Sequence, residues 1–217
     1  MVKIPPTPRH TWDTFSWKVR PTEGMVRGAF FSDGSAFDLS AHGGVLRRLG
    51  WSFAAVDDEG VVLAAASGTP PEWVTCVHGA ELWGFCMALR HAFPGSGFFI
   101  DCQAVERLFK RGAAIATASN VLYARGWCAG FAAFDPDEVP ELTWMPAHTA
   151  RERIGEAKCG EHMWCANQMA DLLAKQGAAA GAYPQSVIST MKGKPSRLLW
   201  LSCIWADSPS KPINTSG

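Results

Sequence analysis

Apolar and polar positions along the 217-residue chain follow one another in short blocks that predict a succession of strands and helices. Five runs are short, mostly apolar and bounded by turn residues, which is typical of buried strands. These runs cover residues 27–32, 51–56, 61–66, 98–100 and 141–145. The second and third runs surround an acidic turn that ends in Gly60, so together they predict a β-hairpin.

Longer segments show the spacing of amphipathic helices. In residues 80–92, for example, Leu82, Phe85 and Leu89 recur on one helical face. The predicted helices cover residues 80–92, 103–110, 119–134 and 161–176. Pro136 ends the third of them, because proline cannot continue a helix. The predicted order is β-β-β-α-β-α-α-β-α, an α/β fold in which helices cover both faces of a mixed five-stranded sheet.

The two ends of the chain differ from its centre. Residues 1–26 contain four prolines and no periodic pattern, so we expect a leader or linker there. Residues 27–177 hold all the predicted elements and form the expected folded domain. Residues 178–217 are treated as a C-terminal extension. Its longest apolar run, residues 198–206, is far shorter than the roughly 20 residues needed to cross a bilayer.

The composition is that of a globular protein, with 47% hydrophobic and 18% charged residues. Twenty basic residues balance twenty acidic ones, so only a local basic patch would favour binding to nucleic acid. The seven cysteines are scattered without a Cys-x-x-Cys pair, as in a reducing compartment, and the N-terminus shows no signal peptide. We therefore expect a soluble, intracellular protein, cytoplasmic or nuclear, that does not bind membranes.

One group of soft ligands stands close together in the sequence. Cys159, His162 and Cys165 follow at three-residue spacing and could begin a zinc site. No fourth ligand is near, and helical spacing alone produces such coincidences. A zinc site is therefore disfavoured.

Four acidic residues lie in or beside mostly apolar segments. They are Asp33 in Phe-Phe-Ser-Asp-Gly-Ser, Glu81 in His-Gly-Ala-Glu-Leu, Asp101 in Phe-Phe-Ile-Asp-Cys-Gln, and Asp171 in Asn-Gln-Met-Ala-Asp-Leu-Leu-Ala. A carboxylate is costly to bury unless it is paired or holds a metal. Solvated caps at strand ends would explain any one of these acids, but not all four. The pattern predicts one site for a hard cation, Mg²⁺ or Mn²⁺.

The local sequences around these acids resemble those of the type 1 ribonuclease H family. Five motifs occur in the family's order: Asp33-Gly34-Ser35, Ala80-Glu81-Leu82, Asp101-Cys102-Gln103, Trp144-Met145-Pro146-Ala147-His148, and the segment from Asn167 to Ala174. The resemblance covers residues 27–177. The chain departs from the family at Cys102, where serine is usual, and at Ala147, where glycine is usual.

The resemblance implies a ribonuclease-H-like fold and an endonuclease that hydrolyses the RNA strand of RNA/DNA hybrids. Two Mg²⁺ ions, which Mn²⁺ can replace, would bridge the scissile phosphate, and no organic cofactor is implied. Residues 27–177 would then be the catalytic domain. The implied metal ligands are Asp33, Glu81, Asp101 and Asp171.

Other matched residues are implied to assist. His148 would help the leaving group or product release, while Gln103 would contact substrate. Asn167, one turn before Asp171, would orient that acid or the substrate beside it. The chain lacks the basic protrusion by which some family members grip DNA, and Arg151 and Arg153 are alternative phosphate contacts.

Two other functions stay open at this point. The chain could be an inactive ribonuclease-H-like domain that binds nucleic acid or serves as a scaffold within a larger retroelement-type protein. It could also be a related exonuclease or integrase-type nuclease, although the order Asp, Glu, Asp, His, Asp suits ribonuclease H better. An active enzyme could be free-standing or part of a larger polyprotein, because the fold alone does not decide function.

Overall fold

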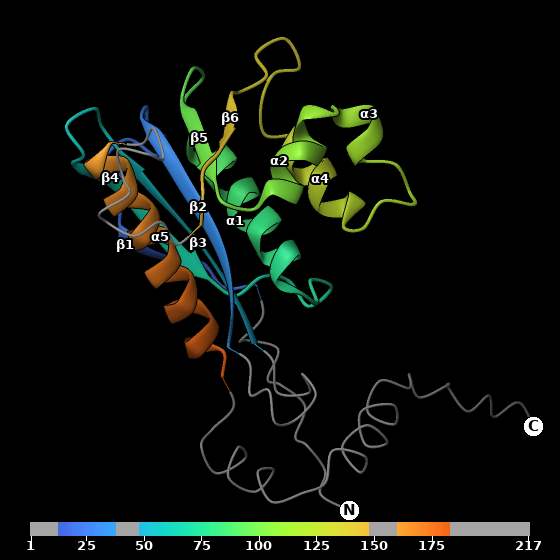
Figure 1. The fold of residues 1–217 in the computed structure, drawn as a ribbon, viewed down its shortest axis with the longest axis horizontal. Helices are drawn as coiled ribbons and strands as arrows, with labels where there is room; N and C mark the ends of the chain where they lie inside the picture. The colour runs from blue at the N-terminus through green and yellow to red at the C-terminus, as the bar shows by residue number, and fades with distance from the viewer. Residues whose placement is uncertain (1–12, 38–47, 148–159, 183–217) are drawn as a thin grey trace, which may run out of the picture.

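The computed structural model describes residues 13–37, 48–147 and 160–182 of the protein. Within these residues, six strands form one mixed sheet in the order β1-β4-β3-β2-β5-β6 (Figure 1). They are β1 (Ser16–Val19), β2 (Ala29–Phe37), β3 (Arg48–Val56), β4 (Val62–Gly68), β5 (Gly97–Ile100) and β6 (Leu142–Trp144). Strands β1 to β4 pair antiparallel, whereas β5 runs parallel to β2 and to β6.

Helices cover both faces of this sheet. They are α1 (Val77–His91), α2 (Gln103–Lys110), α3 (Ala113–Ala116), α4 (Ala124–Phe131) and α5 (Glu161–Ala180). Side chains of β2 alternate between the faces: Phe30 packs in one cluster with Leu82 and other residues of α1. Its neighbour Phe31 packs with Ala170 of α5. Helix α1 thus covers one face and α5 the other (Figure 1).

The mixed α/β architecture with helices on both faces agrees with the prediction, but the predicted number of five strands is wrong. The additional strand, β1, comes from the segment that we expected to be a leader. It pairs with the edge of β4, from Ser16 opposite Ser67 to Val19 opposite Ala65. Three of its four residues are exposed, so this edge strand lacks the hydrophobic alternation that would have predicted it. Trp17 anchors it through an edge-to-face contact with Phe53, 5.8 Å between ring centroids.

The helical region after β5 also differs from the prediction. Helix α2 coincides with its predicted range, but the predicted helix 119–134 is shortened to α4. Tyr123 takes up a left-handed conformation, with φ 63° and ψ 28°, which a regular helix does not contain. Residues 113–116 form the short helix α3, which we did not predict. Helix α5, by contrast, continues to Ala180, beyond the predicted end at residue 176.

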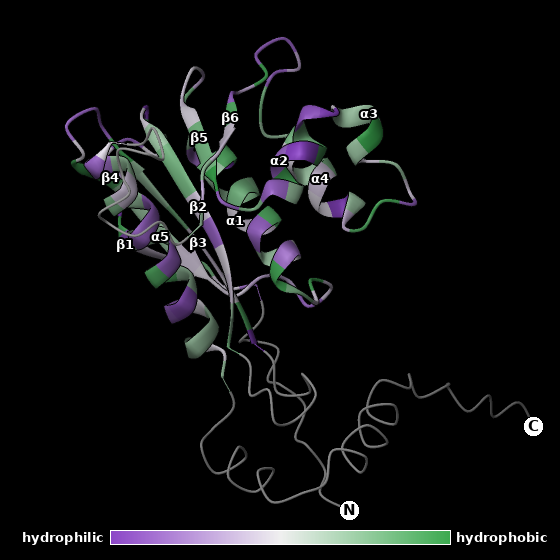
Figure 2. Cartoon of the chain, in the orientation of Figure 1, coloured by the Kyte–Doolittle hydropathy of each residue, from purple (hydrophilic) through white to green (hydrophobic). Residues whose placement is uncertain are grey.

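Small residues let α5 lie directly on the sheet. A Cβ atom on Gly50 of β3 would overlap the backbone nitrogen of Ala178 and the carbonyl oxygen of Ala174. Gly177 similarly lies close to the backbone of Gly68 in β4. Figure 2 shows purple, hydrophilic bands along α5 that alternate with paler and green ones. No helix in the described part of the chain is long and apolar enough to cross a membrane.

The packing of α5 predicts that Gly50→Ala destabilises the protein. The added methyl group meets helix backbone, which cannot move aside as a side chain can, so the free energy of unfolding should fall by about 1–3 kcal/mol or more. Urea denaturation followed by circular dichroism measures this change. Gly97→Ala is the matched control, because the atom nearest its new Cβ, in the Phe99 ring, lies at 3.5 Å. A loss no greater in Gly50→Ala than in Gly97→Ala would contradict this packing.

Candidate metal centre

Asp33 lies in the middle of β2, whereas the predicted strand ended one residue before it, at residue 32. The strand continues to Phe37 because its antiparallel ladder with β3 extends from Ala29 to Phe37. Its parallel ladder with β5, however, ends where Ser32 lies opposite Ile100. Asp33 is therefore the first residue of β2 beyond the end of its neighbour. Its side chain is only 5% exposed.

Asp101 is the residue directly after β5. It continues the register in which Ile100 lies opposite Ser32, so it comes next to Asp33. On the other side of β5, Ile100 pairs with Trp144 of β6. The indole Nε1 of Trp144 donates a hydrogen bond to the backbone oxygen of Asp101, at 3.0 Å. Through this bond Trp144, the first residue of the Trp-Met-Pro-Ala-His motif, helps to fix the backbone at Asp101.

Glu81 reaches the same place from α1. The helix comes so close to β2 that a Cβ atom on Gly34 would overlap the backbone nitrogen of Glu81. One turn further along, a Cβ on Gly84 would lie 3.1 Å from the backbone oxygen of Asp33. Only glycine permits this approach at position 34, which explains why glycine follows Asp33. The Glu81 side chain is consequently 6% exposed.

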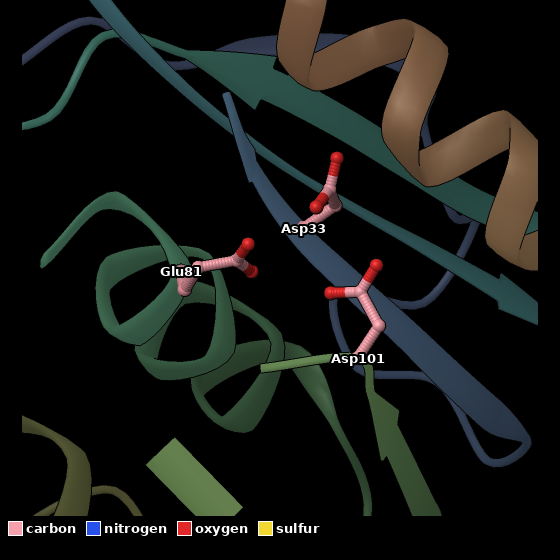
Figure 3. A group of neighbouring side chains, drawn as sticks. All are labelled: Asp33, Glu81 and Asp101. Atoms are coloured by element: carbon pink, nitrogen blue, oxygen red, sulfur yellow. The ribbon is translucent and has the colours of Figure 1, made fainter. Parts of the chain in front are cut away.

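The three acids form one compact group. A carboxylate oxygen from each of Asp33, Glu81 and Asp101 lies within 4.8 Å of one from each of the others. Figure 3 shows the three side chains pointing toward one another from α1, from β2 and from the end of β5. Three sequence motifs separated by up to 68 positions (33 to 101) thus meet at one point.

Burial and mutual repulsion disfavour the state in which all three carboxyl groups are ionised. The pKa of Asp33 is raised from 3.8 to about 7, first by burial and then by the charges of Asp101 and Asp171. Burial also raises the pKa of Glu81 well above its usual range, followed in importance by the charges of Asp33, Asp101 and Cys102. The interaction between the two carboxyl groups lowers the pKa of Asp33 and raises that of Glu81, so it opposes the effect of burial at Asp33 and adds to it at Glu81.

The residues present fit a hard divalent cation. Glu81 Oε2 is buried and has no hydrogen-bond partner among the described residues. A buried oxygen without a partner is costly, and a bound cation would remove that cost together with the repulsion among the acids. All three donors are carboxylates, which suit Mg²⁺ and Mn²⁺ better than zinc. The group can therefore hold either ion through oxygen atoms of Asp33, Glu81 and Asp101.

Asp171 is near this group but does not belong to it. Its Oδ2 accepts a bond from Lys175 Nζ, one helical turn away on α5, at 2.7 Å. Its charge nevertheless acts on Asp33 and raises the pKa of that acid. Asn167, a turn earlier on α5, is 3% exposed, and its Oδ1 has no hydrogen-bond partner in the described part of the chain.

The other predicted site residues are placed differently or not at all. Gln103 is exposed at the first position of α2, close in sequence to Asp101. His148, Arg151, Arg153 and Cys159 lie outside the described residues. The roles of all these residues stay predictions.

One neighbouring pair was missed from the sequence. Cys102 Sγ lies 3.6 Å from Nδ1 of His78, which occupies the first turn of α1. We had noted Cys102 only as a departure from the family motif and had given His78 no role. The one available signal was that His78 precedes Glu81 by three residues and so shares its side of a helix.

Comparisons with known proteins support the fold. No family model matches the sequence, and no curated protein does. Among solved structures, LC9-RNase H1, described as a type 1 RNase H with the type 2 active-site motif, is 16% identical with a TM-score of 0.50, over 71% of this chain and 72% of that one. This likeness shows a ribonuclease-H-like fold and, at such low identity, the fold alone.

Two further solved structures are similar at a lower TM-score. The RNase H domain of PFV is 17% identical, with a TM-score of 0.49 over 72% of this chain and 97% of that domain. The foamy viral protease-reverse transcriptase, solved in complex with an RNA/DNA hybrid, is 17% identical, with a TM-score of 0.48 over 70% of this chain. The chain spans only 20% of the length of that viral protein.

The crowding of the acids predicts that Asp33→Asn stabilises the metal-free protein above neutral pH. Because the pKa of folded Asp33 lies above 3.8, the folded state binds more protons than the unfolded state between about pH 4 and 7, and the stability due to this group falls as the pH rises. At pH 8 the variant should gain roughly 1–3 kcal/mol. Denaturation at pH 5 and pH 8 in the presence of chelator measures the gain.

The comparison across pH separates this effect from a general change in packing. The advantage of Asp33→Asn over the natural protein should be larger at pH 8 than at pH 5, since Asp33 is mostly protonated at the lower pH. A gain that did not change with pH would contradict the repulsion described here. A loss of stability at pH 8 would contradict it as well.

Proposed function

We propose that the protein is an endonuclease that hydrolyses the RNA strand of RNA/DNA hybrids with the help of divalent metal ions. One observation carries this proposal: three buried carboxylates, from Asp33, Glu81 and Asp101, converge within 4.8 Å on a ribonuclease-H-like fold. Phosphodiester cleavage needs stabilisation of negative charge on the phosphate, and such a group of acids can hold the cations that supply it. Each of the three acids also lies in a short sequence motif that resembles the corresponding motif of the type 1 ribonuclease H family.

Asp33, Glu81 and Asp101 would hold Mg²⁺, or Mn²⁺ in its place. Asp171 would contribute a ligand to the second of the two metal ions. Ions bound there would supply Lewis-acid stabilisation of the charge that develops on the phosphate. Because the pKa of Asp33 is raised to about 7, a proton has to leave this acid when a cation binds at lower pH, so binding should strengthen as the pH rises through 7. Trp144 fixes Asp101 through its backbone and thereby positions one ligand.

Substrate contacts are proposed for residues beside this group. Gln103 is exposed at the start of α2, within reach of a strand bound over Asp101. Asn167 would orient Asp171, and His148 would move a proton during product release. Hybrids are recognised mainly by the shape of the minor groove and by 2′-hydroxyl contacts. A formally neutral chain should therefore bind its substrate weakly and lose affinity further in salt.

One observation favours the alternative of an inactive nucleic-acid-binding domain. Asp171 lies outside the group of three acids and is paired with Lys175. If that pairing persists with metal present, only three acids are available for the cations. Measurement of cleavage therefore decides between the two functions, and the contribution of Asp171 has to be tested separately.

The proposed function predicts Mg²⁺-dependent cleavage of a labelled RNA/DNA hybrid, with little cleavage of RNA duplex or DNA duplex. Asp33→Asn and Asp101→Asn should each lower the rate by about a thousandfold or more, because several kcal/mol of charge stabilisation are lost. Asp171→Asn should lower the cleavage rate by a factor at least about tenfold smaller than these two variants do, since this acid lies outside the group of three. Asp137→Asn, in an exposed loop, is the matched control and should cleave normally.

Three results would count against this function. Full activity in excess chelator would show that cations are not required. Equal cleavage of RNA duplex would remove the proposed substrate specificity. Absence of cleavage at saturating Mg²⁺ and Mn²⁺, with the hybrid still bound, would favour the inactive binding domain.

A further inference from the structure

The loop between α4 and β6 divides a double groove on the face of the sheet that α1 covers. One half, with a volume of about 540 Å³, is lined by Phe109 of α2 and Phe131 of α4, among others. The other half, of about 190 Å³, is lined by residues that include Phe93. Phe134 and Pro140 line both halves, so they form a ridge between them. In Figure 1 this loop leads from α4 to the start of β6.

Apolar side chains in both halves of the groove are open to solvent. Val139, in the larger half, is 61% exposed, and Phe93, in the smaller half, is 39% exposed. The rings of Phe109 and Phe131, which line the larger half, are stacked with their centroids 5.3 Å apart. Aromatic walls of this kind suit a flat aromatic or an aliphatic side chain. An exposed apolar surface with a polar rim is typical of a site where another molecule docks.

Acidic residues of the same loop form the rim of the groove. Glu141 lines the larger half, Glu138 lines the smaller half, and both are exposed, as is Asp137. None of these three acids forms an ion pair within residues 13–37, 48–147 and 160–182. Oδ1 of Asp135 accepts a hydrogen bond from the backbone nitrogen of Asp137, at 2.9 Å. Asp135 thus fixes the conformation in which the loop presents the other three acids.

Basic residues near the groove do not cancel this charge. Lys110 lines the larger half, but it is paired with Glu106, one turn earlier on α2. Arg27 lies beside the smaller half, where Nη1 of its guanidinium is 3.1 Å from the position of a Cβ atom on Gly95. Even with Arg27 counted, the three acids leave the groove with a net negative charge. A positively charged occupant is therefore favoured.

The groove lies at the opposite end of β5 from the candidate metal centre. The backbone nitrogen of Phe98, at the start of β5, donates a hydrogen bond to the backbone oxygen of Glu141, at 3.1 Å. Asp101 follows the other end of this strand, three residues and therefore about 10 Å further on. A molecule bound in the groove would leave the three acids of the metal centre uncovered.

We propose that the groove binds a basic peptide segment of a partner protein. A large apolar side chain of the peptide would enter the larger half, beside Phe109 and Phe131, and Lys or Arg residues would face Glu138 and Glu141. Buried apolar anchors of this kind carry most of the affinity of a protein interface, while complementary charge selects the partner. This binding does not depend on the proposed function. The partner would hold the protein in place while its metal centre stays accessible.

Selection of random peptides displayed on phage, with the full-length protein as target, tests this proposal. The retained peptides should combine Lys or Arg with Trp, Phe or Leu. Each is then labelled with a fluorophore, and its dissociation constant is measured by fluorescence anisotropy. Val139→Lys puts a like charge in the larger half and should weaken binding at least about tenfold. The double variant Glu138→Gln, Glu141→Gln should weaken it at least about fivefold and make it less sensitive to salt.

Two matched controls carry the same changes elsewhere on the surface. Leu172→Lys, at a position of α5 that is 55% exposed, and Glu59→Gln, in the turn between β3 and β4, should bind the peptides as the natural protein does. Circular dichroism shows which variants are folded. If Val139→Lys is not folded, the double variant decides, because it changes only exposed side chains.

Three results would overturn the proposal. The first is that no peptide is retained, or that the retained peptides have no excess of Lys and Arg. The second is equal affinity of the natural protein and the folded groove variants for these peptides. The third is self-association, measured by sedimentation, that Val139→Lys abolishes while no peptide binds. That result would assign the groove to a second copy of the chain.

Hybrid cleavage separates this proposal from the proposed function. Val139→Lys and the natural protein should cleave at the same rate, because the groove and the three acids lie at opposite ends of β5. A lower rate in Val139→Lys would contradict the separation of the two sites. Absence of cleavage in both proteins would contradict the proposed function, whereas the peptide measurement would still decide whether the groove binds a basic segment.

Discussion

The close approach of α1 to β2 at Gly34 is the constraint on which the rest of the site depends. Any side chain at that position would overlap the backbone of Glu81. Because the helix lies this near, a glutamate on a helix can meet an aspartate inside a strand. Strand β5 ends opposite Ser32, so Asp101, the next residue, comes beside Asp33, and the carboxylates of both lie close to that of Glu81. Backbone packing thus decides the position of all three carboxylates.

The site is an arrangement of acids that the folded protein holds at a cost to its stability. Burial, and after it the repulsion among the acids, raises the pKa of both Asp33 and Glu81. Glu81 Oε2 has no partner among the described residues, although most buried polar atoms in proteins have one. Departures of this kind concentrate at functional sites, where a ligand supplies the missing interaction.

Much of this arrangement could be predicted from the sequence because its signals are local. Each acid lies in a short motif, and the alternation of apolar runs predicted the strands that deliver Asp33 and Asp101. The edge strand β1 could not be predicted, since it is short and exposed and is held by backbone pairing. The contact between Cys102 and His78 joins residues 24 positions apart, which no periodic pattern reveals. The pair of Asp171 and Lys175, at i and i+4, could have been foreseen.

The central claim is that Asp33, Glu81 and Asp101 together form a site for a hard divalent cation. Anomalous diffraction from crystals of the protein soaked in Mn²⁺ tests this claim most directly, because it locates the ion without reference to activity. We predict an anomalous peak bonded to carboxylate oxygens of all three acids, with Glu81 Oε2 among them. A map at saturating Mn²⁺ with no peak at this group, or with an ion that leaves Glu81 Oε2 without a partner, would contradict the account.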